Sequence, residues 1–265
     1  MELIDVLGYF GAFTVGLVLG LSGGGGSIIT VPVMVYLFGI NPITATAYSL
    51  FVVGSTSSIG AFQNFRKQLI DIKTAIIFAI PAFTVVYLTR RYFVPAIPDT
   101  LFTIADFEIT KEIFIMTFFA IVMFLASISM IRSKKDIPNP DFKSTINIPF
   151  LVFIGVSVGL LTGIIGAGGG FLIIPALVLL AKLPMKKAIG TSLLIIAVNS
   201  LIGFTGDIQN RDIDWSFLFL FTAISILGII VGVYTSKFIS GTKLKRGFGW
   251  FTLLVALYII FRELQ

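Results

Sequence analysis

Long apolar segments separated by short polar turns run through most of the chain. In the first half, the pattern predicts apolar helices at 3–21, 42–62, 72–93 and 111–132, with a short apolar segment at 27–40 between the first two. The second half repeats the plan, with segments at 148–165, 171–181, 185–205, 215–238 and 246–262. A helix needs about 20 apolar residues to cross a bilayer, so most of these segments are long enough. The pattern predicts an all-α polytopic membrane protein in which each half has about five apolar segments.

Two glycine runs, at residues 23–26 and 166–170, separate the first two segments of each half. The first of these two segments is long and the second is short. The halves align without a gap when Gly23 is placed on Gly166, which we call the repeat alignment. In it, 17 of the 51 residues from Phe10 to Gly60 are identical to their counterparts. The chain is therefore an internal duplication, and its two glycine runs occupy equivalent places.

Composition narrows the class of protein. Hydrophobic residues make up 57% of the chain and charged residues 12%, whereas a soluble domain carries about 25% charge. The chain has no cysteine and no histidine, which removes thiolate chemistry, the commonest general base and the commonest metal ligand. We expect no catalytic residue, metal site or cofactor, and therefore no enzyme. The net charge is +6, but the basic residues lie in short loops between apolar segments, which argues against nucleic acid as a partner.

The positive charges predict an orientation. Of the 19 Lys and Arg residues, 14 lie in four segments, at 63–73, 132–147, 182–187 and 237–246. If each half makes an odd number of crossings, all four segments share one side, which is then cytoplasmic. Both termini are then outside the cell membrane. The repeats, at 1–132 and 148–265, then have inverted topology and are joined by a cytoplasmic linker at 133–147.

The glycine runs and the helix after them predict a substrate site. Non-helical backbone at membrane depth is tolerated only inside protein or beside a cavity, and the start of a helix presents unpaired N–H groups to an anion. We therefore expect a central cavity between the runs. The helix at 42–62 adds a polar face, which its counterpart at 185–205 repeats. The predicted substrate-binding residues are Ser22, Gly23, Gly24, Gly25, Gly26, Ser27, Ser49, Thr56, Gly166, Ala167, Gly168, Gly169, Gly170, Thr191, Ser192 and Asn199.

Simpler explanations compete with this site. Glycines also permit close helix packing, which is the role we expect for the pairs Gly16/Gly20 and Gly159/Gly163. Serine and threonine hydroxyls also bond to the backbone of their own helix. Charged residues are expected only at helix ends, where Asp71, Asp207 and Asp214 are solvated or cap helices, and Arg90 lies in the outer region. No buried carboxylate is therefore expected to carry protons.

The repeated pattern resembles a known family. Two copies of G-x-x-x-G-x-x-G-x-G-G-x-x-x-x-x-P, each followed by A-x-x-x-S, are similar to the sulfite exporter TauE/SafE family, also called TSUP. The resemblance covers nearly the whole chain. It implies membrane transport of sulfite, sulfonates or related organic anions by a duplicated architecture. Ala167 stands where the first run has Gly24, and Gly170 where it has Ser27, so the two halves of the site are not identical.

The sequence thus predicts a secondary transporter that moves a small oxyanion by alternating access. An anion channel and a non-transporting membrane subunit are the alternatives. The expected partners are the anion, the lipid bilayer and a coupling ion, H⁺ or Na⁺. The identity of the anion, the direction of transport and the oligomeric state stay open. So does the question whether the segments at 27–40 and 171–181 cross the membrane or return to the same side.

Overall fold

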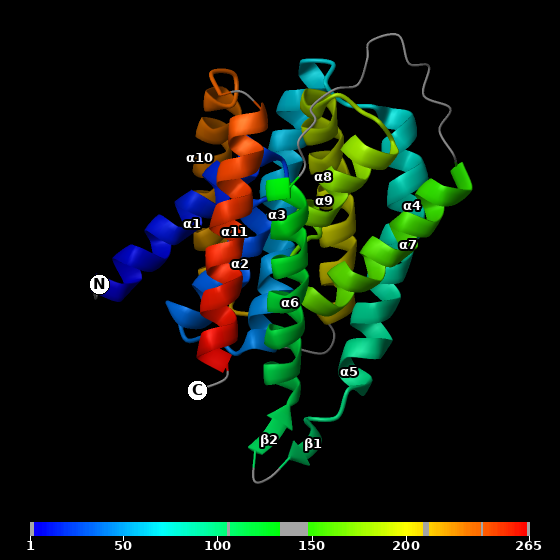
Figure 1. Cartoon of the computed structure of the whole chain (residues 1–265). Helices are drawn as coiled ribbons and strands as arrows, with labels where there is room; N and C mark the ends of the chain where they lie inside the picture. Colours follow the sequence, from blue (N-terminus) through cyan, green and yellow to red (C-terminus); the bar gives the residue numbers. More distant parts are fainter. Residues whose placement is uncertain (1–2, 105–106, 133–147, 209–211, 240, 264–265) are drawn as a thin grey trace.

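The structure, a computed structural model, describes residues 3–104, 107–132, 148–208, 212–239 and 241–263. Its first half contains α1 (Leu3–Ser22), α2 (Gly26–Tyr36), α3 (Pro42–Arg66), α4 (Ile72–Leu88), the π-helical turn η1 (Thr89–Phe93), α5 (Val94–Ala96), the strands β1 (Thr100–Ile104) and β2 (Phe107–Thr110), and α6 (Lys111–Arg132) (Figure 1). Its second half contains α7 (Ile148–Ile165), α8 (Gly170–Pro175), the π-helical turn η2 (Ala176–Leu180), α9 (Met185–Ile208), α10 (Trp215–Thr235) and α11 (Gly241–Glu263).

The helical architecture of a membrane protein is confirmed. Each predicted apolar segment is helical, and five helices are long and apolar enough to cross a membrane within the described ranges. The start of α3 follows its Asn-Pro signal, because the Asn41 side chain accepts a hydrogen bond of 2.9 Å from the backbone N–H of Ile43. The predicted linker at 133–147 lies outside the described residues.

One element was not predicted. The segment before α6, which lies between the helices predicted at 72–93 and 111–132, pairs as an antiparallel hairpin in which Thr100 faces Thr110 and Ile104 faces Phe107. Threonine, isoleucine and phenylalanine dominate both strands, and these residues favour extended backbone. Figure 1 shows the hairpin projecting beyond the helices at one end of the molecule.

The short helix α2 runs back along α1. Gly11 of α1 lies against Val33 of α2, while Gly8 lies against Phe38, just beyond its end. Eleven residues of helix rise about 16 Å, roughly half of a bilayer core. The segment at 27–40 therefore returns toward the end from which α1 came. The six residues of α8 and the five of η2 are together equally short.

The core lies between the two halves of the sequence. Helix α1 packs on α10, α3 on α9, α4 on α7 and α6 on α11, so each major pair joins the first half to the second. The contacts also recur at positions that the repeat alignment makes equivalent. Glycines of α1 contact α10 as glycines of α7 contact α4 and η1, which gives the matched pairs Gly16–Ser225 and Gly159–Ala82, and Gly20–Gly232 and Gly163–Thr89. In the same way Gly60 of α3 contacts Ile229 of α10, and Gly203 of α9 contacts Val86 of α4.

Two aspartates show the same correspondence. Asp71 and Asp214 cap α4 and α10, each accepting a bond of 2.8–3.0 Å from the amide of the third helical residue. Their own backbone amides donate to a side-chain hydroxyl of the other half, Thr191 for Asp71 and Tyr48 for Asp214. The prediction that these two aspartates cap helices is confirmed.

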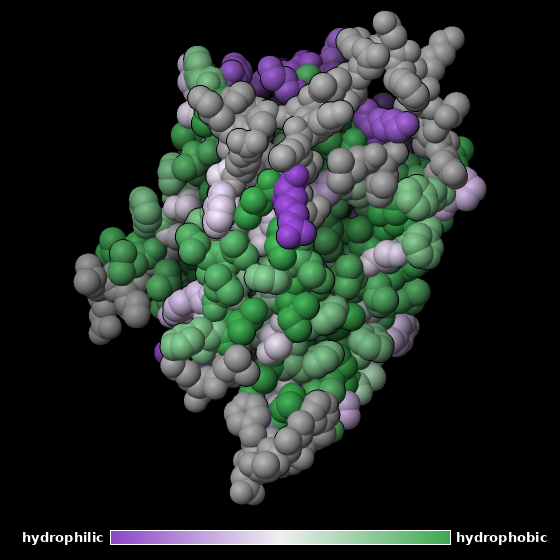
Figure 2. All heavy atoms as spheres, in the orientation of Figure 1, coloured by the Kyte–Doolittle hydropathy of each residue, from purple (hydrophilic) through white to green (hydrophobic). Residues whose placement is uncertain are grey.

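Charge is sorted toward one end of the molecule. The α3–α4, η2–α9 and α10–α11 turns lie together at the end opposite the hairpin (Figure 1). Hydrophilic side chains gather at that end, whereas the flanks are mostly apolar (Figure 2). Large apolar side chains on these flanks, such as Leu125, Leu227 and Leu254, are 60–65% exposed, as expected for surfaces that face lipid.

Candidate functional site

The two glycine runs have different backbones. Gly23 and its counterpart Gly166 both have positive φ, 74° and 70°, which favours glycine. Gly168 also has positive φ, 65°, whereas its counterpart Gly25 is right-handed at −73°. The first run therefore enters α2 almost directly, and the second makes a longer left-handed turn before α8.

The runs cross in direct contact. A Cβ atom added to Gly24 would come within 2.8 Å of the Cα of Gly170, so only glycine fits on either side of the crossing. This differs from the prediction of an open cavity between the runs. The backbones meet because neither residue has a side chain to hold them apart. Any ligand site must therefore lie beside the crossing.

Two of the predicted site residues shape the first run. The Ser22 hydroxyl accepts a bond of 2.8 Å from the amide of Gly25 and donates one of 2.7 Å to Val18 O. The Ser27 hydroxyl donates to the carbonyl of Gly24 at 2.7 Å. These hydroxyls are satisfied by the run itself, which assigns them a structural role in the described conformation.

Some backbone amides of the runs remain available. The amides of Gly23 and Gly166 donate to carbonyls of the preceding helices, at 2.7 and 2.8 Å. In the part of the chain that the structure describes, the amides of Gly24, Ala167 and Gly168 have no hydrogen-bond partner. Unpaired amides in a buried turn are a ready donor set for an anion.

Helices α3 and α9, which pack on each other, carry buried polar groups, and one of these, Ser200, lies beside the second glycine run. Ser49, Thr56 and Ser57 of α3 and Asn199 and Ser200 of α9 are all 0% exposed. Their hydroxyl and amide atoms have no hydrogen-bond partner among the described residues. Each such atom costs about 1–3 kcal/mol, and native proteins contain few of them. A set of five on two facing helices makes this region a candidate binding site for a polar ligand.

Contacts tie this polar lining to the runs. A Cβ on Gly168 would lie 2.7 Å from Val53 of α3 and 3.0 Å from the Ser200 hydroxyl of α9. On the other side, the Ser192 hydroxyl donates to the carbonyl of Gly23 at 2.7 Å. Thr191 is placed apart from the lining, because its hydroxyl is the acceptor for the amide of Asp71.

The structure also buries a charged pair that we did not predict. Arg90 of η1 and Asp207 of α9 are 0% and 2% exposed, and Arg90 Nη1 lies 3.5 Å from Asp207 Oδ2. The prediction that Asp207 is solvated is therefore wrong, while the placement of Arg90 on the outer side stays a prediction. Both residues lie near helix ends, but α3 and the second glycine run cover them.

The guanidinium of Arg90 reaches the second glycine run. Its Nη1 donates to the hydroxyl of Thr46 at 3.1 Å, and its Nη2 occupies the place that a Cβ on Gly166 would need. At the equivalent place in the other half, Gly23 meets the apolar side chain of Ile189. A cation thus lies directly against the second glycine turn, and an apolar side chain against the first.

Basic residues surround a cavity at the opposite end. A cavity of about 400 Å³ is lined by Asn64, Ile189, Lys67, Lys186 and Lys237, among others. Burial, and secondarily the charge of Lys237, lowers the pKa of Lys67. Because Ile189 also contacts Gly23, the cavity approaches the first glycine run.

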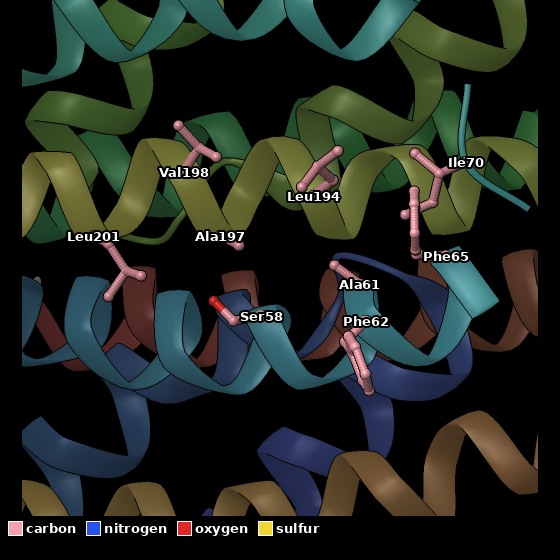
Figure 3. A pocket seen from close by; sticks show the side chains of 9 residues that line it. All are labelled: Ser58, Ala61, Phe62, Phe65, Ile70, Leu194, Ala197, Val198 and Leu201. Carbon is pink, nitrogen blue, oxygen red and sulfur yellow. The ribbon is translucent and has the colours of Figure 1, made fainter. Parts of the chain in front are cut away.

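A second cavity has a different character. It has a volume of about 320 Å³ and lies between α3 and α9, lined by apolar side chains such as Phe62, Phe65 and Leu201 (Figure 3). Its one hydroxyl, from Ser58, donates to Gly54 O at 2.9 Å. This lining suits hydrocarbon and not an anion. No group of three or more Asp or Glu residues that could hold a metal is found in the described ranges.

Comparison with known proteins places the chain in a family. The sequence profile described as "Sulfite exporter TauE/SafE" matches residues 9–259. A "Probable membrane transporter protein" of Xylella fastidiosa (strain 9a5c) is 28% identical over 94% of this chain and 92% of its own length. "Probable membrane transporter protein YdhB" of Bacillus subtilis (strain 168) is 25% identical over 94% and 97% of the two chains. "Probable membrane transporter protein YunE" of the same strain is 27% identical over 80% of each.

No solved structure matches the chain. The profile match covers nearly the whole sequence, and the relatives are similar along nearly their whole lengths. The resemblance seen in the repeated glycine motif is confirmed. The chain belongs to the sulfite exporter TauE/SafE family of membrane transporters.

Proposed function

We propose that the protein is a secondary transporter for a small oxyanion of the sulfite or sulfonate class. The observation that carries this proposal is the set of five buried, unpartnered polar side chains of α3 and α9 beside the glycine crossing. A bound oxyanion would supply the acceptors that these hydroxyls and the Asn199 amide lack. The free amides of Gly24, Ala167 and Gly168 would add backbone donors.

The number of donors suits a transported anion. A charge-assisted hydrogen bond contributes about 1.5–3 kcal/mol, while burying an ion costs several kcal/mol. Three or four such bonds therefore offset the cost of burial without making the anion unable to leave. In this proposal Ser49, Thr56, Asn199 and the amides of the runs bind the anion, while Ser22, Ser27 and Ser192 hold the runs in shape.

The repeated contacts support alternating access. Contacts of the first half recur in the second at positions matched by the repeat alignment, which is the relation expected of two inverted repeats, residues 1–132 and 148–265. The lysine-lined cavity approaches the first run, and the Arg90–Asp207 pair covers the second. In our proposal the described conformation is open toward the lysine-rich end and closed at the other.

We propose further that the lysine-rich end faces the cytoplasm of a cell membrane and that both termini lie outside. Of the 19 cations, 14 belong to the four segments that the sequence assigns to one side, and the α3–α4, η2–α9 and α10–α11 turns at that end belong to three of these segments, as the positive-inside rule expects. An anion would then reach the cavity from the cytoplasm, attracted by Lys67, Lys186 and Lys237.

Ligand-induced stabilisation tests the site. The purified protein is heated in detergent with sulfite, methanesulfonate, sulfoacetate, thiosulfate or sulfate. A ligand at 100 times its Kd raises the stability of the folded state by about 2.7 kcal/mol. We expect a dose-dependent rise with at least one sulfur oxyanion. No shift with any of them would contradict the proposed site.

Glycine variants locate the bound anion. Gly168→Ala should abolish the shift, because its methyl group would occupy the space beside Ser200. Gly25→Ala should do the same in the first run. Gly39→Ala is the matched control, since Gly39 has a similar φ of 64° and no atom within 4 Å of an added Cβ. Binding that persists in both Gly25→Ala and Gly168→Ala would refute the site.

A further inference from the structure

We propose that the Arg90–Asp207 pair couples anion transport to protons: the anion replaces Asp207 as the partner of Arg90, and Asp207 takes up one proton. This inference rests on the proposed function and names its coupling ion. It starts from a buried ion pair, 0% and 2% exposed, beside the glycine turn at Gly166. Ionisable residues at membrane depth are costly, and they mark ion and proton pathways.

The position of Arg90 makes it a ligand for the anion. The guanidinium lies against Gly166, one residue before the free amides of Ala167 and Gly168. A guanidinium binds an oxyanion through paired N–H donors, and more strongly than a neutral donor does. An anion held by these amides therefore lies beside Arg90 and competes with the Asp207 carboxylate for it.

Charge balance then requires a proton. With Asp207 ionised, a monovalent anion beside the pair gives the buried site a net charge of −1. When Asp207 is protonated, the same site is neutral, because the positive charge of Arg90 offsets that of the anion. Burial strongly disfavours uncompensated charge, so the anion and the proton bind together. Each monovalent anion therefore crosses with one proton.

The described contacts of Asp207 and its neighbour Gly206 include no second carboxylate. Helix α9 packs against α3, α4, α8, η1 and η2. Among the described residues of those elements, Arg90 lies 3.5 Å from Asp207, and the neighbouring Gly206 lies against Arg90 and the backbones of Arg91 and Tyr87. The nearest described carboxylates along the chain are Asp212 and Asp214, and Asp214 caps α10. Asp207 is therefore the group that can take the proton.

The internal duplication shows that the pair is not part of the scaffold. In the repeat alignment, Arg90 corresponds to Val233 and Asp207 to Asn64. Asn64 donates to the carbonyl of Gly60 on its own helix at 2.8 Å, and the equivalent fold forms without any charge. The packing of the helices therefore does not need an ion pair at this place.

Transport of methanesulfonate in proteoliposomes tests the coupling, because its single charge does not titrate near neutral pH. In the unmodified protein, one pH unit across the membrane should drive about tenfold accumulation, accompanied by proton movement. Asp207→Asn should still exchange methanesulfonate, but it should lose both the pH drive and the proton flux. The variant then moves net charge, so a potential of 100 mV should drive about 40-fold accumulation.

Three further variants sharpen the result. Arg90→Gln should lose methanesulfonate binding, and Arg90→Gln/Asp207→Asn, which removes both charges, should fold and also fail to bind. Asp214→Asn is the matched control, because asparagine also caps helices and proton coupling should not change.

The outcomes separate this inference from the proposed function. An Asp207→Asn variant that keeps its pH drive overturns the coupling while leaving the transporter intact. If that variant cannot be purified, proton uptake on methanesulfonate binding to the unmodified protein decides, and binding without uptake overturns the coupling. An unmodified protein that neither binds nor moves any tested anion contradicts the proposed function itself.

Discussion

Replacing Asn199 with leucine should make the protein more stable and less able to bind its anion. Asn199 is 0% exposed, and neither its Oδ1 nor its Nδ2 atom has a partner among the described residues. Each unsatisfied atom costs about 1–3 kcal/mol. Leucine has the same branching and the same number of side-chain heavy atoms but no polar atom, so we expect the free energy of unfolding to rise by about 1–3 kcal/mol.

The same substitution removes a donor to the bound anion. Loss of one charge-assisted hydrogen bond, worth about 1.5–3 kcal/mol, weakens binding about 10- to 150-fold. Thermal unfolding in detergent measures both effects, without anion for stability and over a sulfite titration for affinity. A rise in the free energy of unfolding together with a loss of sulfite affinity would show that Asn199 binds the ligand at the expense of stability.

Ser58→Ala is the control for this experiment. Ser58 lies on the same face of the α3–α9 contact as the apolar cavity and bonds to its own helix, so its loss should leave sulfite affinity unchanged. The reasoning is refuted if Asn199→Leu unfolds more readily than the unmodified protein and binds sulfite equally well. The amide would then serve the fold alone.

Four other substitutions test three further predictions. Gly166→Ala and Gly23→Ala both place a side chain at a positive φ, which costs about 1–3 kcal/mol of backbone strain. Only Gly166→Ala displaces Arg90, so sulfite titrations should show a larger loss of affinity for Gly166→Ala than for Gly23→Ala. Thr191→Val removes the acceptor for the amide of Asp71, so thermal unfolding should show a free energy of unfolding lower by about 1 kcal/mol. Unchanged sulfite affinity would confirm that Thr191 lies outside the site, whereas weakened binding would contradict it. The folded-state pKa of Lys67 is lowered, so the unfolded state binds more protons and stability should rise from that pKa up to the ordinary lysine pKa. The free energy of unfolding, measured across that pH range, should rise less in Lys67→Gln than in the unmodified protein. The same pH dependence in both proteins would contradict a lowered pKa of Lys67.

Much of the fold could be predicted because hydropathy and capping are local signals. The start of α3 follows from Asn41 and Pro42, and the end of α1 from the first glycine run. The sequence duplication alone places the two glycine runs at equivalent positions in the two halves. The hairpin at β1 and β2 was missed because its strands are short and follow an apolar helix without a strong turn signal.

The candidate site was only partly predictable. The glycines, Ser49 and Asn199 followed from the repeat, but the crossing at Gly24 and Gly170 depends on how distant helices pack. Arg90 and Asp207 were assigned to helix ends because nothing in the local sequence shows that other helices cover them. One signal could have found Arg90: it lies within the apolar segment predicted at 72–93, where a cation is costly.

Uptake of labelled sulfite into proteoliposomes tests the central claim most directly. Thiosulfate, sulfoacetate and sulfate serve as competitors, and proton and sodium gradients are imposed in turn. The account predicts saturable uptake that at least one competitor blocks, driven by the proton gradient and absent from Gly168→Ala. Flux that does not saturate would indicate a channel. No flux above empty liposomes, from folded protein that also shows no anion-induced stabilisation, would contradict an oxyanion transporter.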